Sequence, residues 1–171
     1  MLITTFWRIV SAVSALLVAP STWADQAADQ QVTRNISFEY FLVSGVSLDA
    51  VAHALSERGP NGHWAQTEWT VNWSKSCEVS VDAVVTFPRV MGTRNLSSSD
   101  RQRLDAMLVA LRAHEMQHVY IGIFAAEEIS RRGCRDTAAI SKYWKSKNRE
   151  LDIRTKRGKS EGVTLSPARL R

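Results

Sequence analysis

The sequence predicts an α+β protein in which an antiparallel sheet packs on one long helix and on a second helix that follows it. Much of residues 35–88 alternates apolar and polar side chains as strands do, and residues 97–132 repeat apolar side chains every three or four positions. A second helical pattern follows Gly133. The length of 171 residues suits one domain. The composition, with 44% hydrophobic and 23% charged residues, excludes collagen-like, low-complexity and disordered chains.

The first 24 residues have the order of a secretory signal peptide. One positive charge precedes an apolar run at residues 9–18 that is too short to span a bilayer, and Thr22 and Ala24 place small side chains before a cut at Asp25. An uncleaved N-terminal anchor is the alternative. No later stretch reaches transmembrane length, so we expect a periplasmic or secreted protein without an integral membrane segment after cleavage. Residues 25–34 are expected to form a flexible leader.

The strands of the expected sheet come next. Residues 35–43 predict a half-buried strand because apolar side chains recur on one side, at Ile36, Phe38, Tyr40 and Leu42. Ser47 can then cap a short helix that ends at Gly59-Pro60. Residues 63–73 and 78–87 alternate in the same way around a turn at 74–76, which favours an antiparallel hairpin closed by Pro88.

Two long helical segments complete the expected domain. The first begins at residues 97–99, where Ser99 and Gln102 have capping-box spacing, and it ends at Gly133. Its length would be near 50 Å at about 1.5 Å per residue. The second begins at Asp136 or Thr137 and runs through residue 151.

Cys77 and Cys134 are the only cysteines, and in an exported protein they predict one disulfide. Closing the loop between them should add about 3 to 4 kcal/mol to stability. A redox or nucleophilic role is the alternative, but the chain has no C-x-x-C motif and no neighbouring base in sequence.

The chemistry lies in His114-Glu115-Met116-Gln117-His118, an H-E-x-x-H motif inside the long helix. Four-residue spacing puts both imidazoles on one helix face, where they can bind one cation, and neutral imidazole suits Zn²⁺. Glu115 projects beside that face, placed to accept a proton from a metal-activated water and to deliver it to a leaving amine. A surface helix with merely polar histidines is the alternative interpretation.

A third ligand must come from the returning helix. Glu127 and Glu128 lie too far along the first helix, at about 15 Å from the motif, and Asp136 sits at the wrong end of the second. An equal rise back from the turn reaches residues 148–152. Glu150 and Asp152 both qualify on this argument.

Positive charge gathers at the C-terminal end. From residue 142 onward there are ten Lys or Arg against three acids. Such an end can attract nucleic acid or anionic lipid, but no nucleic-acid motif accompanies it. We therefore expect a solvated helix face that runs into a basic tail at residues 159–171, with no nucleic-acid partner.

Several motifs together carry a resemblance that covers most of the chain after the signal peptide. They are Gly59-Pro60, Thr67-x-Trp69-x-Val71-x-Trp73 followed by Cys77, Pro88, the H-E-x-x-H motif, and Asp152-x-x-Thr155-x-x-Gly158. In these motifs the chain resembles the bacterial family described as domain of unknown function 922, predicted secreted zinc-dependent proteases. The resemblance implies a zincin-like domain over residues 35–158 and Asp152, rather than Glu150, as third ligand. Leu151 and Arg157 stand where that family usually has Tyr and His.

We therefore expect an exported zinc metallopeptidase that hydrolyses a peptide or protein substrate. His114, His118 and Asp152 would hold Zn²⁺, and Glu115 would be the general base. The alternative is a non-catalytic cell-envelope binding module that retains a structural or vestigial zinc site. An open fourth metal position favours the peptidase, whereas a fourth side-chain ligand favours the binding module.

Overall fold

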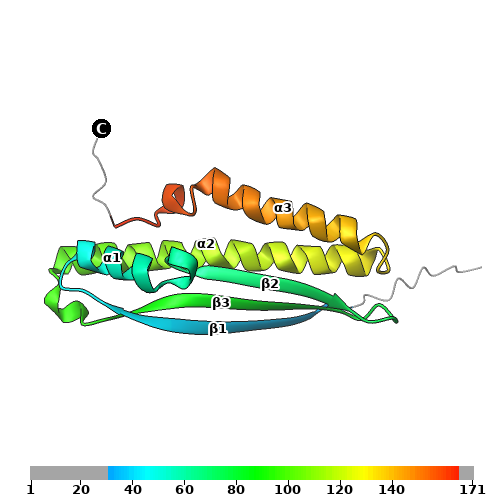
Figure 1. Cartoon of the computed structure of the whole chain (residues 1–171), viewed down its shortest axis with the longest axis horizontal. Helices are drawn as coiled ribbons and strands as arrows, with labels where there is room; N and C mark the ends of the chain where they lie inside the picture. The colour runs from blue at the N-terminus through cyan, green and yellow to red at the C-terminus, as the bar shows by residue number, and fades with distance from the viewer. Residues whose placement is uncertain (1–30, 166–171) are drawn as a thin grey trace, which may run out of the picture.

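The computed structural model describes residues 31–165, so the expected signal peptide, most of the leader and the last six residues lie outside the described part. A sheet, a long helix and a second helix form three successive layers (Figure 1). The strands are β1 (Thr33–Ser44), β2 (Gln66–Trp73) and β3 (Val79–Met91), and the helices are α1 (Leu48–Arg58), α2 (Ser98–Arg131) and α3 (Thr137–Thr155). Short 3₁₀ turns lie at Pro60–Gly62, Thr93–Asn95 and Lys159–Glu161.

The three strands form a mixed sheet in the order β1-β3-β2. The hairpin of β2 and β3 is antiparallel as expected, with Trp69 opposite Ala83. β1 instead pairs with β3 in parallel, with Phe38 opposite Val85. The α+β class is thus confirmed, while the expected all-antiparallel pairing fails at β1. Alternation along a strand shows which side chains share a face, but it does not show the direction of the neighbouring strand.

The exposed side of β1 also differs from the expectation. Phe38, Tyr40 and Leu42 are 40%, 51% and 56% exposed, whereas Val43 on the opposite side is buried. The reason is that α2 packs against β2 and β3, and β1 lies at the rim of the sheet beyond it. Val43 joins the core near α1, which packs against β1.

The expected helices are present with nearly the predicted bounds. Ser47 caps α1, and its hydroxyl accepts the N–H of Ala50. The cap of α2 is Ser97, whose hydroxyl accepts the N–H of Asp100, so the helix begins slightly before the capping pair suggested by spacing. No helix within residues 31–165 is long and apolar enough to cross a membrane.

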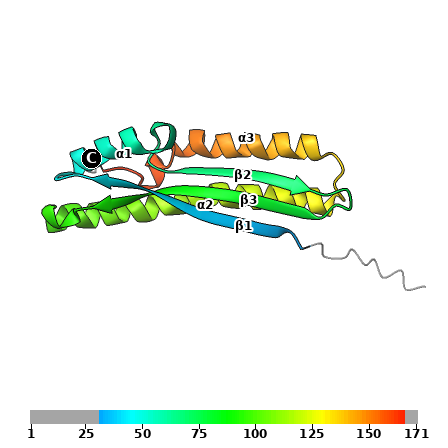
Figure 2. The ribbon, with the colours of Figure 1, turned by 60° about the horizontal axis from the view of Figure 1, so that its bottom comes forward.

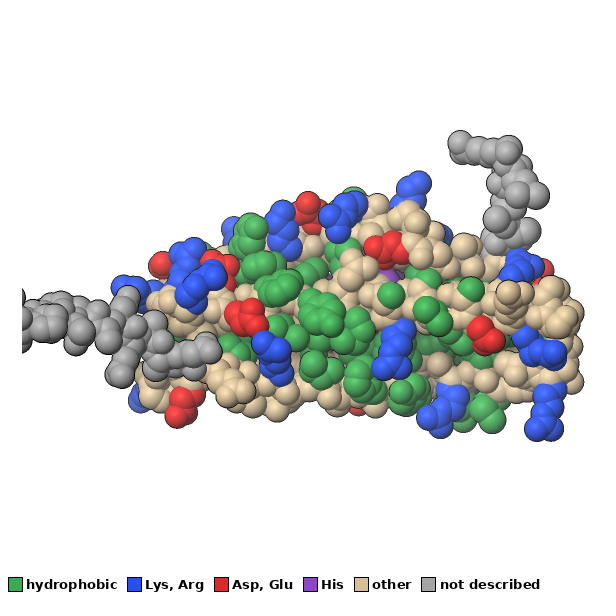
Figure 3. All heavy atoms as spheres, turned by 180° about the vertical axis from the view of Figure 1, so that it is seen from behind, with side chains coloured by type: hydrophobic (Ala, Val, Ile, Leu, Met, Phe, Trp, Pro, Cys, Tyr) green, Lys and Arg blue, Asp and Glu red, His purple; other side chains and the backbone are tan. Residues whose placement is uncertain are grey.

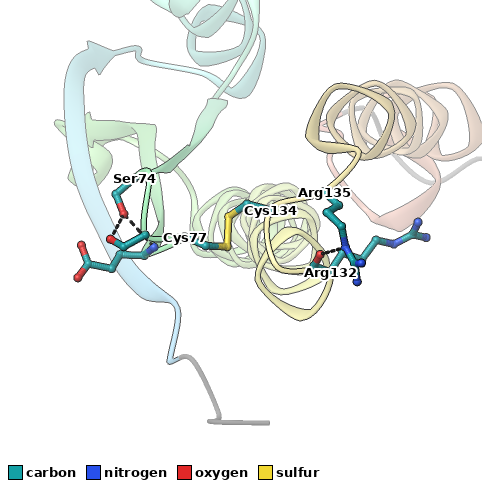
Figure 4. The surroundings of a disulfide bond; sticks show 7 residues. Ser74, Cys77, Arg132, Cys134 and Arg135 are labelled. Atoms are coloured by element: carbon teal, nitrogen blue, oxygen red, sulfur yellow. Dashed lines mark hydrogen bonds between the residues drawn. A yellow bond between two sulfur atoms is a disulfide. The ribbon is translucent and has the colours of Figure 1, made fainter.

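The expected disulfide is present and ties the two layers together at one end. Cys77 lies in the turn between β2 and β3, and Cys134 lies in the turn between α2 and α3 (Figure 4). Both turns lie at the same end of the molecule in Figure 2. The bridge therefore fixes the helical layer to the sheet at the end where α2 turns back into α3.

The segment after α3 packs more closely than a basic tail would. Residues 156–158 have positive φ values of 53°, 56° and 75°, and this left-handed turn reverses the chain. Val163 and Leu165 are then buried in the core, and Arg103 of α2 donates to the carbonyl of Leu165. The packed domain thus extends through residue 165, past the expected start of the tail. Because the segment is rich in charged residues, its composition does not indicate that Val163 and Leu165 are buried.

Candidate metal centre

Three side chains that could hold a metal ion meet between α2 and α3. His114 and His118 are buried on α2, and Asp152 comes from α3. Nε2 of His114 lies 3.4 Å and Nε2 of His118 lies 3.3 Å from Oδ1 of Asp152. A tetrahedral zinc with bonds of about 2.0–2.1 Å has ligand atoms about 3.3–3.4 Å apart. Both distances to Asp152 fit that edge, and all three ligand atoms lie within 4.8 Å of one another, so the donor set suits a metal ion such as Zn²⁺.

Asn148 of α3 holds the ring of His118. Its Oδ1 lies 2.9 Å from Nδ1 of His118 and accepts a hydrogen bond of 3.1 Å from the indole Nε1–H of Trp69 on β2. Because an indole N–H can only donate, Asn148 presents its oxygen to both groups. Nδ1 of His118 therefore carries the proton, and Nε2 keeps a lone pair directed at Asp152.

Glu161 holds the ring of His114 from the 3₁₀ turn that follows α3. Its Oε2 lies 2.9 Å from Nδ1 of His114, and its Oε1 accepts from Gln117 at 3.0 Å. Burial alone would raise the pKa of Glu161, but the hydrogen bonds from Gln117 and His114 outweigh it and hold that pKa below its ordinary value. An ionised carboxylate only accepts, so Nδ1 of His114 donates and Nε2 is free to bind a cation.

Glu115 is buried beside the cluster and is held by the sheet. Thr67 of β2 donates to Oε2 of Glu115 at 2.7 Å. Burial raises the pKa of Glu115, and the Thr67 hydrogen bond and the two histidines offset part of that effect. Glu115 is thus a positioned carboxylate next to the three clustered side chains and not one of them.

The structure separates the two acids that spacing left open. Glu150 is exposed and accepts from Lys147 at 2.7 Å, a contact that lowers the pKa of Glu150. Asp152 lies with the histidines. Two residues on a helix differ by about 200° in direction, so only one of them faces α2.

Four of the supporting residues received no role at the site from the sequence: Thr67, Trp69, Asn148 and Glu161. Asn148 had a usable signal, because it lies four residues before Asp152 and hence on the same face of α3. Glu161 had none, since its segment has the composition of a solvated tail.

A cleft of about 480 Å³ opens beside the cluster and includes His114, Glu115 and Asp152 in its lining. Its other walls come from α1, from residues 62–65 before β2, and from residues 157–165 after α3. In the described part of the chain the candidate ligand group has three members and no fourth side-chain ligand. The side of the group without a ligand can therefore be open to the cleft.

A second groove, of about 490 Å³, runs between α2 and α3 and contains none of the clustered residues. The half-exposed aromatic side chains of Tyr120, Phe124 and Tyr143 line it. Hydrophobic side chains also gather along the middle of the back face, among scattered Lys and Arg (Figure 3). His114, Glu115 and Asp152 line the first cleft and none of them lines this groove.

One family model matches the chain: bacterial protein of unknown function (DUF922), over residues 38–159. The match covers most of the sequence and includes the three clustered residues, Glu115 and Thr67. It stops two residues before Glu161. No curated protein and no solved structure matches the chain.

Proposed function

The chain belongs to the bacterial family of unknown function DUF922, and from this premise we propose that it is an exported zinc-dependent metallopeptidase. His114, His118 and Asp152 would hold the metal, and Glu115 would act as general base. The observation that carries the proposal is the meeting of two histidine Nε2 atoms at one Asp152 oxygen, 3.4 and 3.3 Å away, beside a buried carboxylate.

Each residue near the cluster has a defined task in peptide hydrolysis. A bound Zn²⁺ would polarise the substrate carbonyl and make water nucleophilic near neutral pH. Glu115 accepts the proton of the attacking water and returns it to the leaving amine. Thr67 holds this carboxylate at 2.7 Å, so that it stays beside the ligands. Asn148 and Glu161 accept hydrogen bonds from the protonated Nδ1 atoms of the two histidines, so both Nε2 atoms remain unprotonated and can bind the metal.

The second candidate is a cell-envelope binding module with a structural zinc. Structural zinc sites have four protein ligands, whereas catalytic ones have three and keep a position for water or substrate. The three-member group and the adjoining cleft therefore favour a catalytic site.

Metal analysis and hydrolysis assays test the proposal. The purified protein should contain about one zinc per chain, and His114→Ala should lose most of it. His53→Ala is the matched control, because this histidine is exposed on α1 beside Glu57. Stoichiometric zinc in His114→Ala would contradict the site.

Glu115→Gln separates catalysis from metal binding. The substitution leaves all three ligands in place, so zinc content should be unchanged while peptide hydrolysis falls at least about 10²-fold. If the zinc-loaded wild type and Glu115→Gln are equally inactive on a broad peptide mixture, the binding module becomes the better account.

A further inference from the structure

Two basic residues belong to the wall of the cleft beside the metal centre. Arg157 and Lys159 line the same hollow as His114, Glu115 and Asp152. Within residues 31–165 neither side chain makes a hydrogen bond or an ion pair. Apart from Glu115 and Asp152, the one described acid in the lining is Asp49. Outside the site residues Glu115 and Asp152, two of the three charged side chains in the lining are therefore positive.

The backbone fixes Arg157 next to the cluster. Its N–H donates to the carbonyl of Asp152 at 2.7 Å. The next residue, Gly158, packs so closely on His114 that an added Cβ would lie 3.1 Å from Cγ of that ring. Arg157 thus lies in the chain between the residue that supplies one candidate ligand and the residue that supports another.

The turn that carries Arg157 is strained. Lys156 and Arg157 have φ values of 53° and 56°, a left-handed conformation that is unfavourable for non-glycine residues. The hydroxyl of Thr155 accepts the N–H of Gly158 at 3.1 Å and helps to hold the turn. Strain of this kind gathers at functional sites, where the surrounding structure maintains it. Here the turn returns the chain to His114 and places Arg157 in the lining of the cleft.

The chemistry of these groups selects the ligand. A guanidinium presents a planar fork of N–H donors that matches a carboxylate, and an unpaired cation beside a low-dielectric wall attracts anions. The apolar side chains of Trp64, Leu111 and Val163 in the same lining can accommodate an aliphatic stem. A peptide carries carboxylates on Asp and Glu and at its C-terminus.

We propose that Arg157, assisted by Lys159, binds a carboxylate of the peptide substrate in the cleft beside the metal centre. The proposal rests on the peptidase function and adds a substrate class to it. The carboxylate comes from an acidic side chain near the cleaved bond or from the chain terminus, and the experiment distinguishes the two sources.

Cleavage of a mixed peptide library by the zinc-loaded full-length protein, read by mass spectrometry, gives the first test. We expect bonds near Asp, Glu or a free C-terminus to be cleaved at least about ten-fold faster than matched neutral ones. For the best-cleaved peptide, replacing the acidic side chain by its amide or amidating the C-terminus identifies the source. Arg157→Gln should bring the acid-to-amide ratio of kcat/KM close to one. Arg154→Gln should leave that ratio unchanged, because Arg154 borders the other groove.

Binding provides a readout that does not depend on turnover. In zinc-loaded Glu115→Gln protein, calorimetry should give a Kd about ten-fold lower for the acidic peptide than for its amide, and the added Arg157→Gln change should abolish the difference. Zinc content, measured for each variant, shows whether the site still forms, and Arg157→Lys, which keeps the charge, should retain part of the preference. Cleavage without acid preference, or a preference that survives Arg157→Gln in zinc-bound protein, would overturn the assignment and leave the peptidase function intact. Absence of cleavage of any peptide would overturn both.

Discussion

His114 and His118 leave the same face of α2 one turn apart, yet two different regions of the molecule hold them. We call each histidine, together with the residues that support it, one half of the site. The His118 half includes Asn148 of α3 and Trp69 of β2, which lie in elements predicted from the sequence. The His114 half rests on Glu161 and Gly158, which follow α3 in a segment with the composition of a tail. Identical spacing on one helix therefore does not imply identical support.

The two halves also differ in charge. An ionised carboxylate accepts the Nδ1–H of His114, whereas a neutral amide oxygen accepts that of His118. A carboxylate partner raises the basicity of a histidine ligand more strongly than a neutral acceptor. The difference implies that metal affinity depends more on the C-terminal turn than on Asn148.

Asp152 joins the two halves, so its loss should have the largest effect. Its Oδ1 approaches both histidines, and Asp152→Ala removes the one anionic ligand of the group. Zinc affinity should fall by about 10³-fold, or about 4 kcal/mol, in competition with a chromophoric chelator. Glu150→Ala on the same helix is the control and should bind zinc normally. Zinc loss in Glu150→Ala with retention in Asp152→Ala, or loss in neither variant, would show that Asp152 is not the third ligand.

Each half depends on one close-packed glycine, and these glycines should differ in effect. A Cβ at Gly158 would lie 2.6 Å from Cγ2 of Val163 at a φ of +75°, so Gly158→Ala should lower the free energy of unfolding by about 2–4 kcal/mol. A Cβ at Gly122 would lie 2.8 Å from Cγ of Trp69. Alanine has a higher helix propensity than glycine, which offsets up to about 1 kcal/mol of this clash, so Gly122→Ala should lower the free energy of unfolding by about 1–2 kcal/mol. Urea unfolding measures both. Equal losses would mean that the left-handed turn is not the more constrained support.

Exchanging the chemistry of the two supporting groups should have the smallest effect. Glu161→Gln makes the partner of His114 neutral and should lower zinc affinity by about ten-fold. Asn148→Asp gives His118 a carboxylate, still able to accept from Trp69, and should raise zinc affinity by a few-fold, on the order of 1 kcal/mol or less. Isothermal titration with zinc measures both changes. Glu57→Gln, at an exposed acid on α1, is the control. Shifts in the same direction would contradict the electrostatic difference between the halves.

Local patterns in the sequence determined a large part of this protein. Periodicity and capping residues located the hairpin and all three helices, since these signals act within a few residues of one another. The two cysteines allowed a single intramolecular pairing. The H-E-x-x-H spacing put His114 and His118 on one helix face, because 3.6 residues per turn fixes the direction of side chains on the same helix.

The tertiary structure decided what distant segments contribute. Spacing admitted both Glu150 and Asp152, and the packing of α3 on α2 brought Asp152 to the histidines. The parallel pairing of β1, the contact of Thr67 with Glu115 and the return of Glu161 to His114 join residues 47 or 48 positions apart. No local rule of helix or strand geometry relates such positions, because their meeting depends on how whole elements pack and where the chain turns back. The sequence by itself thus determined the side chains that one helix presents, and the fold decided which others meet them.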